Sequence, residues 1–378
     1  MLMQVKESKL SNGMRLITSS IPGVESVAFG IWVGVGGRYE SNSMAGASHF
    51  IEHLLFKGTK KRSASDISRA IEGRGGYLNA FTQEENTCYY ARVAHDHLWS
   101  AAEILCDMYL NAEMKEEDIA KERGVIIEEI MMYRDQPQHV VQEMLGKALW
   151  KNHGLGRPII GFPETLKAMG RKELIGFKNA KYVPSNTVFA IAGKLDHDAC
   201  ISRLEKIMKG RARGSVPVCD SVTGRTKQER IVVEKKEIEQ SHVAMGVRLF
   251  GHNAQRRYTL RVLNAVLGEN MSSRLFQVVR EKHGLAYSVH SSAQLFEDSG
   301  ALVISAGLDR KRTIKAVELI VREIARIKRE LVGPRELARA KEDAGFHRLA
   351  LAAFLKGLQG RPDHGGVMAP AYGSLAAA

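Results

Sequence analysis

Two histidines four residues apart, with a glutamate directly before the second, constrain this chain more than any other feature of its sequence. His49 and His53 are one helical turn apart, so a helix places both imidazoles on one face, where they can bind the same cation. Paired neutral imidazoles suit zinc. Glu52 is then near the metal without being a ligand, and a carboxylate there can act as a general base. The sequence therefore predicts a zinc centre on a helix.

The residues around this pair predict that the helix is buried. Asn42 and Ser43 offer side-chain oxygens for an N-cap, and Lys57 with Gly58 is typical of a helix end. A catalytic zinc usually takes three protein ligands, so a third ligand must come from another part of the chain. Large apolar residues supply the buried side of the helix: Phe50, Ile51, Leu54 and Leu55.

Residues 116–135 predict a second helix, with acidic residues in its first turn and Arg134 in its last. Glu122 and Glu129 are seven residues apart, which is two helical turns, and so they share a face. Glu128 is a competing choice for the third ligand. The apolar residues between these glutamates predict that the helix is largely buried, and a buried carboxylate requires a partner such as a cation.

These two segments resemble the inverted zincin peptidases, the family of pitrilysin, insulysin and the mitochondrial processing peptidases, and among them the short bacterial members. The resemblance rests on the His-x-x-Glu-His order, which reverses the commoner zinc-peptidase order, and on the sequence of residues 122–129. It covers residues 5–344. The other matching segments are 10–15, 76–82, 273–276 and 280–287.

The resemblance implies a role for each matching residue. It favours Glu129 as the third ligand, and it places Glu122 behind the ligands, where a carboxylate orients a ligating imidazole. Arg280 and Tyr287 match residues that the second half of these enzymes supplies to contact the substrate. They are expected to help stabilise the anionic tetrahedral intermediate.

The same resemblance implies how the substrate and the subunits meet. An extended peptide would pair by strand addition with Asn79, Ala80 and Phe81 on an exposed strand edge, which gives main-chain hydrogen bonds and little side-chain selectivity. Family members enclose unfolded peptides in a chamber made by two similar halves or subunits. A homodimer, or a heterodimer with a related subunit, is therefore expected.

The chain is also similar to itself. Residues 26–34 and 242–250 read alike, and a repeat of that spacing suits a duplicated domain. Further strands are expected near 77–93 and 285–308. The expected fold class is α+β, with two similar α/β halves related by internal duplication. Each half is a mostly antiparallel sheet with helices packed on one face.

Composition suggests where the chain divides. Residues 1–210 are expected to form the zinc-binding catalytic half, and the Gly/Arg/Pro/Ser-rich residues 211–226 a linker. Residues 227–344 form the second half, which lacks the metal motif and contributes substrate contacts. Residues 345–378 are an atypical tail, truncated or disordered. Within it, residues 360–378 are expected to lack an ordered element that faces a core.

Charge and hydropathy indicate which classes of binding partner are expected. No run of 18 apolar residues predicts a membrane span, and no signal or transit pattern is seen. The four cysteines lack metal-site spacing, which favours a reducing compartment and a cytoplasmic location of bacterial type. The net charge is +13, of which +11 falls after residue 210. No recognised nucleic-acid motif accompanies it, so neither nucleic acid nor a membrane is an expected partner.

The combined prediction is a zinc-dependent endopeptidase or oligopeptidase with one Zn²⁺ per chain. It would hydrolyse extended peptides by metal activation of water, with Glu52 as general base. The alternative is a non-catalytic core or partner subunit of the same fold, in a peptidase or a respiratory-type complex. The presence of His49, His53 and Glu129 together with Glu52 favours the enzyme.

Overall fold

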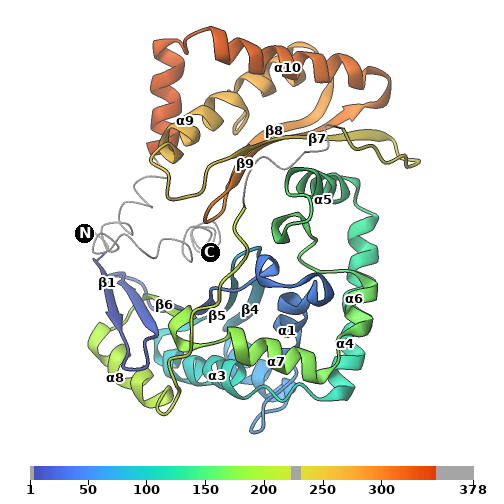
Figure 1. Ribbon diagram of the computed structural model, residues 1–378. Coiled ribbons are helices and arrows are strands. Elements are labelled where there is room, and N and C mark those ends of the chain that lie inside the picture. The colour runs from blue at the N-terminus through green and yellow to red at the C-terminus, as the bar shows by residue number, and fades with distance from the viewer. Residues whose placement is uncertain (1–3, 223–230, 346–378) are drawn as a thin grey trace. The chain divides into compact units, whose positions relative to one another are not determined.

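A computed structural model describes residues 4–222 and 231–345 of the chain (Figure 1). Its described residues fall into two compact units. The first unit holds residues 4–132 and 157–220, and the second holds residues 133–156 and the described residues after 220. The expected tail lies outside the described residues apart from Gly345, and so does the prediction for 360–378.

A six-stranded sheet forms the centre of the first unit. Among its described strands β2 and β6 pair in parallel, and the other neighbours are antiparallel. β4 is the last strand of the order and therefore has a free edge. In spatial order the strands are β1 (Gln4–Lys9), β2 (Arg15–Ser20), β6 (Thr187–Gly193), β3 (Ser26–Val33), β5 (Thr87–Ala94) and β4 (Tyr77–Thr82).

Helices cover one face of this sheet (Figure 1). The helix α1 contacts β4 and β5, and α3 contacts β3 and β5. Since side chains alternate along a strand, Ala80 and Thr82 lie on the helix-covered face of β4, whereas Asn79 and Phe81 lie on the opposite face. The helices of the first unit are α1 (Ala47–Leu55), α2 (Ala64–Ile71), α3 (Leu98–Asn111), α4 (Glu116–Arg134), α6 (Pro163–Ala168), α7 (Arg171–Lys181) and α8 (His197–Ile207).

The start of α1 differs from the prediction. The expected N-cap at Asn42 or Ser43 is wrong, because these residues lie in a separate 3₁₀ turn and α1 begins after Gly46. Gly46 has a φ of +95°, a left-handed conformation that favours glycine. The cap comes from Glu40, whose carboxylate accepts hydrogen bonds from the Gly46 N–H at 2.8 Å and the Ser48 N–H at 2.7 Å.

The second unit contains a three-stranded antiparallel sheet in the order β7-β9-β8. The two sequence segments that read alike are both strands, β3 and β7, and strands also occur in both of the further regions where they were predicted. The helices and strands that Figure 1 labels in this unit are α5 (Pro137–Leu149), β7 (Gln240–Leu249), α9 (Arg257–Leu267), β8 (Ala286–Leu295), β9 (Gly300–Asp309) and α10 (Thr313–Arg329).

Both faces of this second sheet are covered. Ile304 and Ala306 on β9 pack into a core shared with residues of α9 and α10. Ala301 and Val303 point to the other side and pack with Leu149 at the end of α5. This alternation is the two-residue period of a strand. The sheet therefore holds α5 in the second unit, although α5 precedes it by about a hundred residues.

This packing bears on the expected domain limits. The segment Tyr133–Gly156, which includes α5, groups with the second unit rather than with residues 1–210. Residues 211–222 have no regular secondary structure, as a linker requires. The limits at 210 and 226 stay a proposal. Within the described part of the chain, no helix combines the length and the hydropathy that a bilayer crossing needs.

Lys178 on α7 provides a test of this core. Its ammonium is buried 5.8 and 5.9 Å from the ring centroids of Tyr109 and Tyr182, and burial lowers the pKa of Lys178 to about 8. The unfolded chain keeps this proton up to the ordinary pKa of 10.5, so the buried charge costs stability below pH 8, and the cost fades between pH 8 and 10.5. We expect Lys178→Met to raise the free energy of unfolding by about 1 kcal/mol at pH 7.

Urea denaturation at pH 7 and pH 10.5 measures this effect. The gain should shrink at the higher pH. Lys172→Met, an exposed lysine on the same helix, is the matched control and should change little at either pH. Equal effects of the two substitutions would contradict a buried charge at Lys178.

The capping role of Glu40 gives a second prediction. Glu40→Ala leaves two buried N–H groups at the start of α1 without acceptors, and we expect the free energy of unfolding to fall by about 2 kcal/mol. Glu40→Gln retains one acceptor oxygen and should lose less. The control is Glu164→Ala, an exposed glutamate in the first turn of α6, with an expected loss below about 0.5 kcal/mol. A Glu40→Ala loss as small as this would contradict the cap.

Candidate metal centre

Two helices bring three candidate ligands together. His49 and His53 lie one turn apart on α1, with their ring centroids 4.6 Å apart. Glu129 on α4 places its Oε2 atom 3.8 Å from the Nε2 of His49 and 3.7 Å from the Nε2 of His53. One ligand atom from each residue lies within 4.8 Å of the others. A tetrahedral ion with bonds of about 2.1 Å sets its ligand atoms about 3.4 Å apart, so these three residues fit one divalent ion after a small contraction.

The structure also separates the two candidates for the third ligand. Glu128 is exposed and lies outside the cluster, whereas Glu129 faces both histidines. Among the described residues this is the one group of three or more His, Cys, Asp or Glu side chains with ligand atoms close enough for a shared ion.

Behind the cluster, a buried carboxylate fixes one of the imidazoles. The Nδ1 of His53 lies 3.1 Å from Glu122 Oε2, and Lys57 Nζ lies 2.7 Å from Glu122 Oε1. A carboxylate can only accept, so His53 donates from Nδ1, and its Nε2 lone pair is left for a metal. Lys57 balances the negative charge that Glu122 carries into the interior.

His49 is held in the form that a metal requires. Burial, with the nearby His53, lowers the pKa of His49 to about 3, so that its imidazole is neutral at physiological pH. A neutral imidazole is the ligating form. The Nδ1 of His49 is buried with no hydrogen-bond partner in the described part of the chain.

Glu52 lies beside this cluster without belonging to it. Its carboxylate accepts a hydrogen bond from the Thr82 hydroxyl, with the oxygens 2.5 Å apart. Burial raises the pKa of Glu52, the charge of Glu129 adds to the increase, and the Thr82 hydroxyl and His53 oppose it. A raised pKa makes this carboxylate a better proton acceptor, as a general base requires.

Sequence reasoning missed two residues that act on this centre. Lys57 was interpreted only as part of the end of α1, although the ion pair with Glu122 is its main contact. Thr82 directly follows the predicted Asn79–Phe81 edge on β4. Its place on the helix-covered face follows from strand alternation once the pairing of β4 with β5 is known.

The residues predicted to contact the substrate are divided between the two units. Asn79, Ala80 and Phe81 are partly or fully exposed on the free edge strand β4 of the first unit. Arg280 and Tyr287 belong to the second unit and are described within it alone. The structure therefore brings the three candidate ligands together with Glu52 and Glu122 in the first unit. Arg280 and Tyr287 lie in the second unit.

Both second-unit residues sit on irregular backbone. Arg280 lies in the π-helical segment Phe276–Lys282, and its guanidinium carbon is 4.7 Å from the ring centroid of Phe276. Tyr287 is 77% exposed and falls at a bulge in the pairing of β8 with β9. π-Helical turns and bulges are frequent at functional sites, because they redirect individual side chains.

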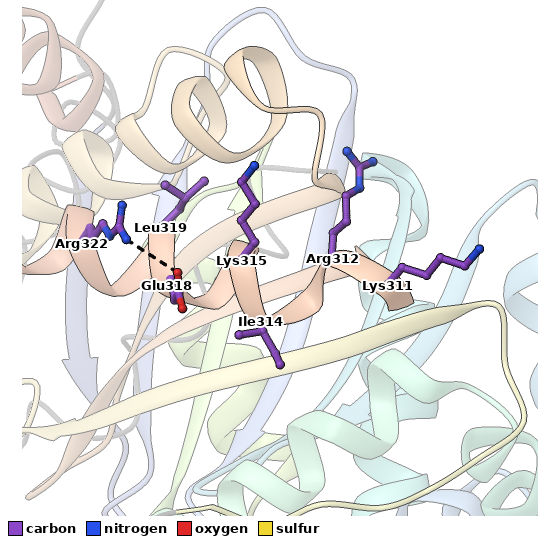
Figure 2. Close-up of a pocket in the computed structure, with 7 residues that line it drawn as sticks. All are labelled: Lys311, Arg312, Ile314, Lys315, Glu318, Leu319 and Arg322. Carbon is purple, nitrogen blue, oxygen red and sulfur yellow. Dashed lines mark ion pairs between the residues drawn. The ribbon is translucent and has the colours of Figure 1, made fainter.

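A separate hollow lies on α10 of the second unit. This hollow has a volume of about 480 Å³ and is lined mainly by basic side chains (Figure 2). Its single carboxylate, that of Glu318, is 3.7 Å from the guanidinium of Arg322. The hollow has no histidine and no cysteine in its lining, so it offers no set of metal ligands.

The chain was compared with known proteins. A family profile described as insulinase, peptidase family M16, matches residues 15–162, and one described as the peptidase M16 inactive domain matches residues 168–343. The uncharacterized zinc protease YmxG of Bacillus subtilis is 40% identical over 341 residues, which is 89% of this chain and 82% of that protein. An uncharacterized zinc protease of Mycobacterium leprae is 41% identical over 327 residues, 85% of this chain and 73% of that protein.

Solved structures share the fold. A protease from Helicobacter pylori superposes with a TM-score of 0.84 at 21% identity, covering 93% of this chain and 86% of that one. A chain of complex III2 from Candida albicans gives a TM-score of 0.78 at 20% identity, with coverage of 93% and 82%. The predicted two-half α+β fold is thus confirmed. The two profile matches, the sequence relatives and the shared fold show that the chain belongs to the M16, or insulinase, family of peptidases.

Proposed function

We propose that this protein is a zinc-dependent endopeptidase that hydrolyses extended peptides, with one Zn²⁺ held by His49, His53 and Glu129. The convergence of two imidazole nitrogens and a carboxylate oxygen carries the proposal, because two histidines and a glutamate are a catalytic zinc set that leaves a coordination position open. The names of the bacterial relatives, uncharacterized zinc proteases, support it.

Bound in this place, zinc supplies a Lewis acid that polarises the scissile carbonyl and makes water a better nucleophile near pH 7. Side chains of the protein transfer the protons and orient the ligands. Glu52 takes the proton of the attacking water and then gives it to the departing amine nitrogen. Glu122 keeps the Nδ1 proton of His53 in place, and Lys57 forms an ion pair with the other oxygen of Glu122.

Arg280 and Tyr287 are proposed to contact the substrate. The Arg280 guanidinium and the Tyr287 hydroxyl would donate hydrogen bonds to the substrate and to the oxyanion of the tetrahedral intermediate. The exposure of Tyr287 and the irregular backbone at both residues support this role. Their matching positions in the family motif are the main reason to assign it.

Substrate binding is proposed at the free edge of β4. Asn79, Ala80 and Phe81 would pair with an extended peptide, so that unfolded segments are favoured over folded proteins. A homodimer or a heterodimer with a related subunit would enclose the peptide. A cytoplasmic location is part of the proposal, supported by the reduced thiols of Cys88, Cys106 and Cys200.

The alternative is a non-catalytic subunit. The similarity to a chain of a respiratory complex concerns the fold alone, at 20% identity. The complete ligand set and the adjacent Glu52 favour the enzyme, since a scaffold has no need for two partly buried imidazoles facing a carboxylate. The basic side chains of Figure 2 lack interleaved aromatic residues, so they give little support to nucleic-acid binding.

The ligand assignment predicts the metal content of two neighbouring variants. Glu129→Gln should weaken zinc affinity at least about tenfold, because a neutral amide replaces an anionic ligand. Glu128→Gln, next to it on the exposed side of α4, should bind zinc as the wild type does. Competition with a chromophoric chelator and elemental analysis measure both. Similar losses in the two variants would contradict the choice of Glu129.

The role of Glu52 predicts a separate effect on turnover. Glu52→Gln should lower kcat on a quenched unstructured peptide by about 10²- to 10⁴-fold while zinc stays bound. A chelator should abolish wild-type cleavage, and added zinc should restore it. Full activity of Glu52→Gln would contradict its role as the base. A zinc-loaded wild type that cleaves no peptide would favour the non-catalytic subunit.

A further inference from the structure

We propose that Thr82 is a positioning residue for Glu52, whose carboxylate it orients through one hydrogen bond from the strand that also forms the substrate edge. The inference rests on the proposed peptidase function and adds a residue to it. It starts from the contact of the Thr82 hydroxyl with Glu52 Oε2, which joins β4 to α1 across 30 residues of sequence.

The direction of this hydrogen bond is determined by its surroundings. The hydroxyl of Thr87, directly opposite Thr82 in the β4–β5 pair, donates to the Val35 carbonyl at 2.9 Å. Its distance to the Thr82 hydroxyl is 3.5 Å, at the limit for a hydrogen bond. Thr82 therefore keeps its own proton for Glu52, and an ionised carboxylate can only accept it.

The hydrogen bond from Thr82 occupies one carboxylate oxygen of Glu52 and leaves the other available. Oε2 is held by Thr82, and within the described part of the chain Oε1 has no protein hydrogen bond. A glutamate side chain has three rotatable bonds, and a general base must lie within about 3 Å of the proton that it takes. Fixing one oxygen removes most of that freedom and points the other at a constant position.

The strand that holds Thr82 adds a second consequence. Thr82 lies on the helix-covered face of β4, while the main chain of residues 79–81 forms the free edge proposed to bind the peptide. One rigid strand would therefore set both the base and the substrate backbone. Without the hydrogen bond the Glu52 carboxylate would be more mobile, and proton transfer would be slower. The edge of β4 would still bind the peptide. We therefore expect a lower kcat and an unchanged KM.

The test compares Thr82→Val and Thr82→Ser in the zinc-loaded full chain on a quenched peptide. Valine keeps the shape and removes the hydroxyl, so we expect kcat to fall about 10- to 100-fold, with KM and zinc stoichiometry unchanged. Serine keeps the hydroxyl and should stay within about threefold of the wild type. If Thr82→Val does not fold, Thr82→Ala takes its place with the same expectation.

Thr18→Val is the matched control. Thr18 is a buried threonine of the same sheet, and its hydroxyl bonds the His197 ring at 2.8 Å, away from the metal cluster. It should lower the melting temperature and leave kcat intact.

Three results would overturn the inference. They are an unchanged kcat in the hydroxyl-free variant, a kcat loss that only follows lost zinc, and no rescue by serine. An inactive wild type would instead contradict the proposed peptidase itself.

Discussion

The site depends on one packing arrangement, in which α1 presents two imidazoles to two carboxylates of α4. Glu122 and Glu129 are two turns apart on one face; Glu122 contacts His53 Nδ1, and Glu129 contacts the Nε2 atoms of both histidines. A buried carboxylate is costly unless it is paired. Glu122 is paired by Lys57 and His53, whereas the contacts of Glu129 in the described part of the chain are with the Nε2 atoms of His49 and His53. That imbalance leaves a place for a cation between Glu129 and the histidines.

The rigidity of this arrangement comes largely from residues outside the two helices. Glu40, six residues before Gly46, supplies the acceptors for the first turn of α1. Arg157 in turn donates to the Glu40 carbonyl at 2.5 Å. Arg157 thus contacts the backbone of the residue whose carboxylate caps α1. Preorganisation of this kind keeps ligand atoms within the narrow distances that a metal tolerates.

The sequence could predict those parts of the site that depend on local geometry. The spacing of His49 and His53 and that of Glu122 and Glu129 follow from the helical repeat alone. Residue-level reasoning left Glu128 and Glu129 as alternatives, because neighbouring positions on a helix differ by only 100°. Resemblance favoured Glu129, and the structure places it beside the histidines.

Contacts that join distant segments could not be predicted in this way. Nothing in the residues near 42 shows that α1 begins later and is capped by Glu40, so the local cap signal at Asn42 was misleading. Thr82 reaches Glu52 only because β4 pairs with β5 in one register, and a shift by one residue would turn its side chain to the other face.

The position of α5 has the same physical origin. α5 follows α4 with only Asp135 and Gln136 between them, and residues 1–210 were expected to form one half. β9 has apolar side chains on both faces, so a helix on one side leaves Ala301 and Val303 uncovered. Gly246 on β7 allows α5 to approach closely, because a Cβ there would lie 2.9 Å from Leu149. The apolar side chains on both faces of β9 therefore explain why α5 packs in the second unit, although α5 directly follows α4, the helix that carries Glu129.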